Sequence, residues 1–110
     1  MSFKIITTEP FEREFKRLFK KYRSLKKDID PLLKELTENP TNGIPIGKSC
    51  YILRMAIRAK GKGKSGGARI ITLVRVVNES VYLLDIYDKS EKEDISEKEL
   101  AKLILEANQK

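Results

Sequence analysis

The chain has 110 residues, of which 40% are hydrophobic and 35% are charged, with one cysteine, no histidine and a formal net charge of +7. This length and composition predict a single domain over residues 1–110 whose core needs no disulfide, and they exclude a disordered chain. No apolar run approaches the roughly 18 residues of a membrane-spanning helix, and the first residues lack the apolar core of a signal peptide. We therefore expect a cytoplasmic protein with no membrane partner.

The first 22 residues have the pattern of a strand followed by a helix. Residues 3–7 are rich in β-branched side chains, which predicts a short strand. Thr8 before Pro10 is typical of a helix start, because the hydroxyl can cap the first turn and proline suits its opening positions. Apolar residues then recur at helical spacing over residues 11–22, and we expect this stripe to pack in the core.

A second helical pattern begins at Ser24 and contains a proline. Apolar residues recur at helical spacing over residues 25–36, and Pro31 interrupts them. Proline in a helix interior predicts either a kink there or a helix that begins later, near Asp30. The turn-forming residues 39–47 end the pattern as a loop, so the two helices are expected to form an antiparallel hairpin.

The second half of the chain changes to strand patterns. Residues 50–59, 68–78 and 81–88 are rich in Ile, Leu, Val and Tyr, and they predict an antiparallel three-stranded meander. Ser96 with Glu99 forms a capping box that starts a last helix. The resulting order β-α-α-β-β-β-α predicts an α+β fold in which the N-terminal helical hairpin packs on a four-stranded antiparallel sheet.

Basic residues are concentrated in the middle of the sequence. Residues 39–78 contain eight of them and no Asp or Glu, whereas the segments before and after together carry a net charge of −1. The eight are Lys48, Arg54, Arg58, Lys60, Lys62, Lys64, Arg69 and Arg75. A region of one sign predicts a polyanionic partner, most often a nucleic acid. The alternative is that solvated lysines only keep the protein soluble, but surface lysines of that kind usually alternate with acids.

Residues 60–69 read Lys-Gly-Lys-Gly-Lys-Ser-Gly-Gly-Ala-Arg and form a basic, glycine-rich loop. The spacing Gly-x-Gly-x-x-Gly resembles a dinucleotide-binding motif, but a β-branched strand follows where that motif requires a helix. Gly-Lys-Ser at residues 63–65 resembles the end of a P-loop, but Arg58 stands where that motif requires its first glycine. We therefore expect a flexible loop whose glycines let the backbone approach a phosphate, while Arg69 grips the phosphate through two hydrogen bonds. The alternative is a basic hairpin tip without a specific role.

The loop and a later segment together resemble RelE-type toxins of type II toxin–antitoxin systems. The later segment, residues 84–95, reads Leu-Asp-Ile-Tyr-Asp-Lys-Ser-Glu-Lys-Glu-Asp-Ile, and the pair is most similar to the HigB-like subgroup of the RelE/ParE superfamily. The resemblance covers nearly the whole chain and implies a single RelE-like domain. It also implies a toxin that inhibits translation by cutting mRNA, typically on the ribosome, and that is silenced by a cognate antitoxin. Contact with DNA is then expected only indirectly, through the antitoxin complex.

The resemblance also implies where the site lies. It places the loop lysines and Arg69 in the site, with Tyr87 and Lys89 closing it and Arg54 supporting it from the preceding strand. The candidate catalytic residues are Lys62, Lys64, Arg69, Tyr87 and Lys89. The candidate RNA-binding residues are Lys48, Arg54, Arg58, Lys60 and Arg75.

The residue types of the basic segment point to metal-independent chemistry. A metal-dependent nuclease needs clustered carboxylates, and this segment has none, so we expect neither a metal nor another cofactor. RNA supplies its own nucleophile, the 2′-OH, and cleavage needs a base, an acid and stabilisation of the phosphorane. Lys62 or Lys64 is the candidate base, because crowded cations disfavour each other's protonated form, and Arg69 would stabilise the phosphorane. Tyr87 or Lys89 would supply the proton, or Tyr87 would stack on a nucleotide base.

Two other functions are compatible with the same residues. The first is a non-catalytic basic RNA- or DNA-binding module in which the loop only neutralises phosphates, and the absence of histidine from the sequence favours it. The second is a ParE-like toxin that poisons gyrase by protein contact, since fold does not fix function. The glycine–lysine loop argues against this second alternative. For the toxin reading, we expect an antitoxin whose partly acidic, disordered segment folds onto the basic segment.

Overall fold

The computed structural model describes residues 2–109, which form three α-helices, one 3-10 helix and five strands. In chain order the elements are β1 (Lys4–Thr7), α1 (Glu9–Lys21), α2 (Leu25–Glu38), β2 (Ile44–Gly47), β3 (Cys50–Met55), the 3-10 helix η1 (Arg58–Lys60), β4 (Ala68–Arg75), β5 (Ser80–Asp88) and α3 (Glu97–Asn108). The predicted α+β class is confirmed. Among residues 2–109 we find no helix that is long and apolar enough to cross a membrane.

The strands form one five-stranded sheet with the order β1-β5-β4-β3-β2. Neighbouring strands pair antiparallel, except that β1 pairs parallel to β5. The predicted four-stranded antiparallel sheet is therefore wrong in its strand count and in the direction of β1. The prediction assigned residues 44–47 to a loop because of Pro45 and Gly47, but these residues form β2. Proline is tolerated in β2 because it is an edge strand, where a missing N–H need not break the ladder.

The helical hairpin forms where the sequence predicts it. Thr8 caps α1, since its Oγ1 accepts a hydrogen bond from the backbone N–H of Phe11 at 3.4 Å. The same hydroxyl donates to the carbonyl of Leu83 in β5 at 3.0 Å, and this joins the start of the helix to the sheet. α2 is continuous and carries Pro31 in its interior, so a later start of this helix is wrong.

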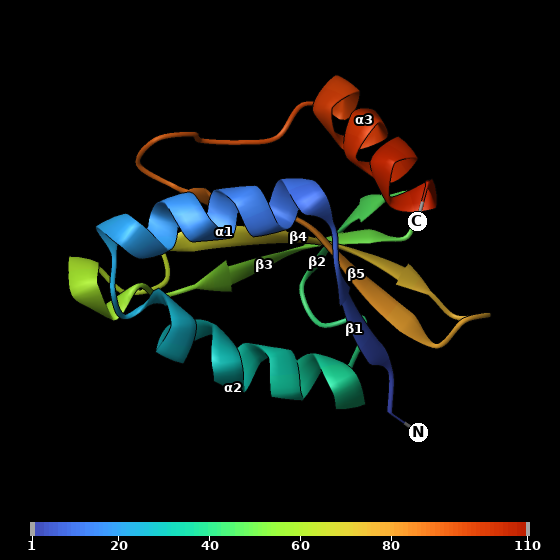
Figure 1. The fold of residues 1–110 in the computed structure, drawn as a ribbon, viewed down its shortest axis with the longest axis horizontal. Helices are drawn as coiled ribbons and strands as arrows, with labels where there is room; N and C mark the ends of the chain where they lie inside the picture. The colour runs from blue at the N-terminus through green and yellow to red at the C-terminus, as the bar shows by residue number, and fades with distance from the viewer. Residues whose placement is uncertain (1, 110) are drawn as a thin grey trace.

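Each face of the sheet has its own apolar core. One core forms against α1 and α2, whose Leu18, Leu25 and Leu36 are fully buried. The other core includes Leu100 and Ala107 of α3. A connection without helix or strand, residues 89–96, leads from the end of β5 to α3 (Figure 1). Because strand side chains alternate between the two faces, the central strands β3, β4 and β5 contribute residues to both cores.

The connection between β3 and β4 begins with a 3-10 turn instead of the longer strand that the sequence predicts. β3 ends at Met55, and η1 follows after two residues. Gly61 has a φ of 69° and ends η1 in the left-handed conformation that glycine adopts without strain. Gly67 lies so close to β3 that a Cβ there would come 2.0 Å from the carbonyl oxygen of Met55. The backbone path itself therefore requires glycine at these two positions of the loop.

Candidate active site

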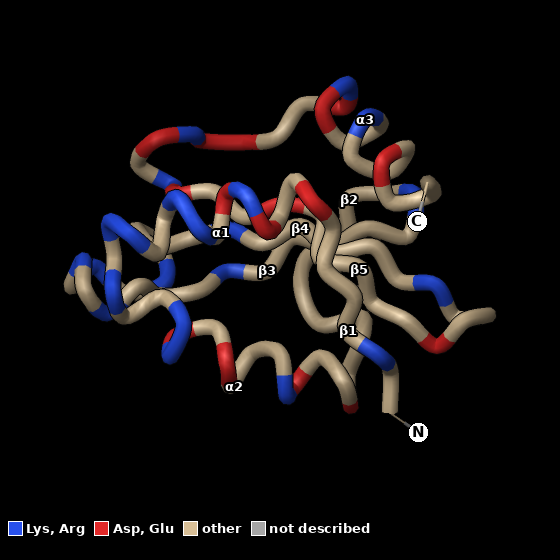
Figure 2. The backbone as a smooth tube through the Cα atoms, viewed as in Figure 1, with Lys and Arg blue, Asp and Glu red and all other residues tan. Residues whose placement is uncertain are grey.

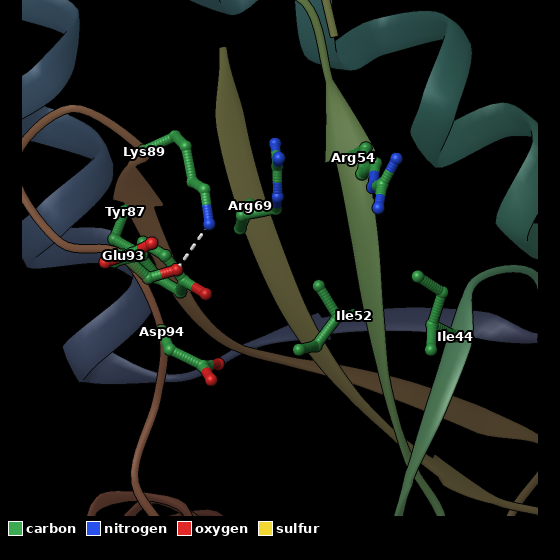
Figure 3. Close-up of a pocket in the computed structure, with 8 residues that line it drawn as sticks. All are labelled: Ile44, Ile52, Arg54, Arg69, Tyr87, Lys89, Glu93 and Asp94. Carbon is green, nitrogen blue, oxygen red and sulfur yellow. Dashed lines mark hydrogen bonds between the residues drawn. The ribbon is translucent and has the colours of Figure 1, made fainter. Parts of the chain in front are cut away.

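Three predicted site residues form a row across neighbouring strands. Arg54 of β3 lies opposite Arg69 of β4, and Arg69 lies opposite Tyr87 of β5. Residues opposite each other in a ladder project on the same face of the sheet, here the face that carries α3. Lys89 follows two residues after Tyr87, and its side chain lies beside this row (Figure 3). The four side chains line one cleft of about 410 Å³, whose other walls are Ile44, Ile52, Glu93 and Asp94.

The cleft continues around Arg54 into two further hollows. Their volumes are about 430 and 260 Å³, and Arg54 lines both of them as well as the cleft. Lys64 lines both hollows, and Arg58 borders the outer one. We call the three cavities together the basic groove. The fold thus gathers six of the ten predicted site residues along it: Arg54, Arg58, Lys64, Arg69, Tyr87 and Lys89.

Arg69 is largely buried and has a structural as well as a site role. Its residue surface is only 7% exposed. The Nη1 group donates to the carbonyl oxygens of Lys64 at 2.9 Å and Ala68 at 3.2 Å, and Nη2 donates to that of Ser65 at 3.4 Å. The guanidinium therefore holds the end of the glycine–lysine loop while it lines the cleft. The loop position of Lys64 depends on this arginine.

Tyr87 forms the floor of the cleft and is 5% exposed. Burial raises the pKa of its phenol, and the negative charge of Asp94 raises it further, against a smaller opposite effect of Arg69. The phenol is therefore protonated at neutral pH and can donate a hydrogen bond or a proton. The ammonium of Lys92 lies 5.4 Å from the centroid of the ring.

Lys60, a predicted RNA-binding residue, does not line the groove. Its Nζ lies 2.6 Å from Oδ1 of Asp88 and 3.1 Å from Oγ of Ser90. Asp88 also accepts a hydrogen bond from the hydroxyl of Tyr22 at 2.8 Å. Burial alone would raise the pKa of Asp88, but the hydrogen bonds from Lys60, Ser90 and Tyr22 outweigh it and lower this pKa. The side chains of Lys60 and Asp88 are 7% and 0% exposed, so the ammonium is held in a buried ion pair.

Lys48 and Arg75 lie at the opposite end of the sheet from the loop. Lys48 is in the turn before β3, whereas Arg54 is near the end of that strand. Arg75 ends β4 and donates a hydrogen bond to the side chain of Asn108 in α3. The structure therefore separates both residues from the basic groove, and neither lines any of its three cavities.

Two loop residues lie at or beyond the edge of the groove. Nε of Arg58 is 3.8 Å from Oδ1 of Asp28 in α2, and the arginine side chain is 84% exposed. Lys62 is exposed in the loop, and it lines neither the cleft nor the two hollows. Lys64 is therefore the loop lysine that contributes to the groove.

The sequence of the whole domain matches a known family. The family is described as the RelE toxin of the RelE/RelB toxin–antitoxin system, and its model matches residues 4–109. The chain belongs to the RelE toxin family. It is therefore the toxin component of a toxin–antitoxin system, and the family implies an antitoxin as its partner. The RelE-type resemblance found in the sequence is confirmed.

Solved structures of RelE share the fold. The isolated Escherichia coli RelE toxin is similar with 19% identity and a TM-score of 0.60, over 94% of this chain and 99% of that chain. A doubly substituted variant of E. coli RelE in its free state is similar with 18% identity and a TM-score of 0.59, over 99% and 97%. At these identities the similarity establishes the common fold, whereas the site is defined by the residues of this chain.

The cleft of this RelE-family toxin contains two carboxylates that the sequence analysis missed. Glu93 and Asp94 lie across from the arginines, on the connection between β5 and α3 (Figure 3). Lys89 fixes part of this connection, because its Nζ donates to the carbonyl oxygen of Glu93 at 2.6 Å. Within residues 2–109, no three His, Cys, Asp or Glu side chains gather closely enough to hold a metal ion. Both carboxylates lie in residues 84–95, the second segment of the resemblance to RelE-type toxins. They lie outside the acid-free segment 39–78, from which the residues of the site were mainly predicted.

Proposed function

We propose that this RelE-family toxin is an endoribonuclease that cuts mRNA without a metal ion and so inhibits translation on the ribosome. The cognate antitoxin would silence it in the cytoplasm, and contact with DNA would come only through the antitoxin complex. The observation that carries the proposal is the row of Arg54, Arg69 and Tyr87, with Lys89 beside it in one cleft. Guanidinium groups and a protonated phenol together suit a phosphodiester bond, because they can bind its charge and donate to its leaving oxygen.

The arginines would stabilise the phosphate during the reaction. The guanidinium of Arg69 has five N–H donors and gives only part of them to the loop carbonyls. Arg54 lies opposite on β3, is exposed, and can reach a second phosphate oxygen. Negative charge on these oxygens grows as the phosphorane forms, and cations already in place stabilise that state more than the starting one.

The proton transfers need one acceptor and one donor. A carboxylate of Glu93 or Asp94 would take the proton of the 2′-OH, because an ionised carboxylate accepts a proton while an ammonium has no lone pair. This assigns the base to the missed carboxylates rather than to Lys62 or Lys64. The 2′-oxygen then bonds to phosphorus, the bond from phosphorus to the 5′-oxygen breaks, and Tyr87 gives its proton to that oxygen. The products are a 2′,3′-cyclic phosphate and a 5′-hydroxyl.

The test is cleavage of mRNA by purified variants, with and without ribosomes. Tyr87→Phe removes the proposed acid without changing the ring, and we expect the cleavage rate to fall by roughly 100-fold or more. Lys102→Gln, an exposed substitution on α3, is the control and should cleave normally. EDTA should have no effect, and the new 3′ ends should carry a 2′,3′-cyclic phosphate.

Three outcomes would contradict the proposal. Cleavage lost in EDTA and restored by Mg²⁺ would refute the metal-free mechanism. RNA binding without cleavage would favour the non-catalytic binding module. Growth arrest with intact mRNA and inhibited gyrase would favour the ParE-like alternative.

A further inference from the structure

A second group of basic residues lies where α1 meets α2, and its last member, Lys27, also lines the outer hollow of the groove. Residues 16–27 contain seven basic residues and no Asp or Glu. The seven are Lys16, Arg17, Lys20, Lys21, Arg23, Lys26 and Lys27. All seven are exposed, and Figure 2 shows basic segments gathered at this end of the molecule. We call these seven residues the hairpin basic surface.

Most of this charge is not neutralised within the fold. Arg17 lies 2.8 Å from a carboxylate oxygen of Glu91, and Lys21 lies 3.3 Å from the other. Arg17 also pairs with Glu14 at 3.0 Å. Across residues 2–109, the salt bridges leave out the other five members of the surface. Five exposed cations therefore face solvent together.

Helix stability accounts for only part of the placement of these charges, since Lys20 and Lys21 lie in the last turn of α1, where the helix dipole favours cations. Lys16 and Lys20 are four residues apart on α1, and like charges at that spacing destabilise a helix. Lys26 and Lys27 occupy the first turn of α2, where the positive end of the helix dipole disfavours cations. Helix stability therefore does not explain Lys26 and Lys27, and charges placed against the dipole of their own helix indicate a role in binding.

The surface adjoins the loop that borders the groove. The backbone N–H of Ala59 donates to Oγ of Ser24 at 3.0 Å, and that of Arg58 donates to a carboxylate oxygen of Asp28 at 3.2 Å. These bonds join η1 to the turn between the two helices. A polyanion on the hairpin basic surface therefore lies next to the outer end of the groove.

The chemistry of the surface suits a phosphate backbone and not unpaired bases. Its aromatic neighbours, Phe19 and Tyr22, are partly buried and pack against the core. The guanidinium of Arg23 also covers the ring of Phe19 at 5.5 Å, so this ring offers little face for a base to stack on. Proteins that bind double-helical RNA use its phosphates, hydroxyls and shape, whereas single strands are bound by stacking on aromatic rings.

We propose that the hairpin basic surface binds the phosphate backbone of a double-helical RNA segment next to the strand that is cut. This inference rests on the proposed function, because it assumes that RNA occupies the groove. The surface would hold a structured RNA while the groove takes a single strand. Its position on two helices keeps the cations in a rigid arrangement that a regular duplex can match.

The experiment compares two variants with the same change of charge. The first replaces Lys16, Lys20 and Lys26 with Gln and keeps Lys27, because Lys27 lines the outer hollow of the groove. The control replaces three exposed lysines elsewhere with Gln: Lys4, Lys34 and Lys102. Binding is measured with a 2′-O-methylated RNA duplex of about 16 base pairs, which cannot be cut. The salt concentration is varied from about 50 to 200 mM, a range over which two phosphate contacts change the affinity by about tenfold.

We expect the first variant to bind the duplex at least about tenfold more weakly, and its plot of log affinity against log salt to be flatter by about 3. The control should keep most of the affinity, and both variants should cut a short single-stranded RNA like the unchanged protein. Equal losses in both variants would overturn the proposal, because net charge alone would explain them. Loss of binding to anionic vesicles or to an acidic peptide, with duplex binding unchanged, would also overturn it. The duplex assay needs no cleavage, so failure of the proposed nuclease activity would be seen separately.

Discussion

The buried pair of Lys60 and Asp88 predicts that Lys60 stabilises the fold. Lys60→Met keeps the length of the side chain and removes its charge. Asp88 is 0% exposed, so the variant leaves a buried carboxylate supported only by neutral donors such as Tyr22 and Ser90. Removing one partner of a buried pair typically costs about 3–5 kcal/mol, which is a large part of the roughly 5–15 kcal/mol that stabilises a domain.

The assay is urea unfolding followed by circular dichroism, at several pH values. The pKa of Asp88 is lowered in the native state, so its contribution to stability is complete above its unfolded value of about 3.9. That contribution declines as the pH falls through this value toward the native pKa. We therefore expect the difference in the free energy of unfolding between the unchanged protein and Lys60→Met to be largest near neutral pH and to narrow below about pH 4.

Lys62→Met is the matched control in the same loop. Lys62 is exposed, so its replacement should change the free energy of unfolding by less than about 0.5 kcal/mol. The double variant with Lys60→Met and Asp88→Asn should recover part of the lost stability, because the buried charge is then absent. If Lys60→Met and Lys62→Met had equally small effects on the free energy of unfolding, the stabilising role of the buried ion pair would be refuted.

Three other changes test the fold. Burial raises the pKa of Asp85 to about 6, so the free energy of unfolding should fall as the pH rises from about 4 to 6. Asp85→Asn should flatten this pH profile in urea titrations and raise the free energy of unfolding at pH 7 by up to about 3 kcal/mol. An unchanged profile would contradict the raised pKa of Asp85. Gly67→Ala should lower the free energy of unfolding, measured by thermal unfolding, by about 2 kcal/mol or more, because its Cβ would clash with the carbonyl oxygen of Met55. Ser96→Ala should lower the free energy of unfolding by about 1 kcal/mol in the same measurement, because the hydroxyl of Ser96 accepts a hydrogen bond from the backbone N–H of Glu99 at 3.1 Å in the capping box. An unchanged melting temperature would refute the contribution of this cap to stability.

The composition of the site could be predicted only in part. The acid-free segment 39–78 identified the right chemistry, but it runs along β3 and β4 in both directions and so places charges at both ends of the sheet. Strand register decides that Arg54, Arg69 and Tyr87 form one row. The hydrophobic pattern of one strand does not show which of its residues lie opposite which residues of the next strand, because this register depends on how all the strands pack.

The repeated Lys-Gly pattern of residues 60–64 also did not reveal which of its lysines would be buried. Lys60 and Lys64 have similar neighbours in the sequence, yet one is buried against Asp88 and the other lines the groove. The 3-10 turn of η1 makes this difference, because it directs Lys60 toward the helical hairpin. The sequence could not show it, since Asp88 and Tyr22 come from distant segments.

Local signals determined most of the secondary structure. The cap at Thr8 and the capping box at Ser96 were predicted correctly, because a cap depends on a side chain and a backbone group only three residues apart. Tertiary structure alone decided the edge strand β2, the parallel pairing of β1 with β5, and the arrival of Glu93 and Asp94 in the cleft. The pairing of β1 with β5 and the position of the two carboxylates join segments far apart in the chain, whereas β2 pairs with the neighbouring β3. All three features depend on burying both faces of the sheet at once, which no single segment encodes.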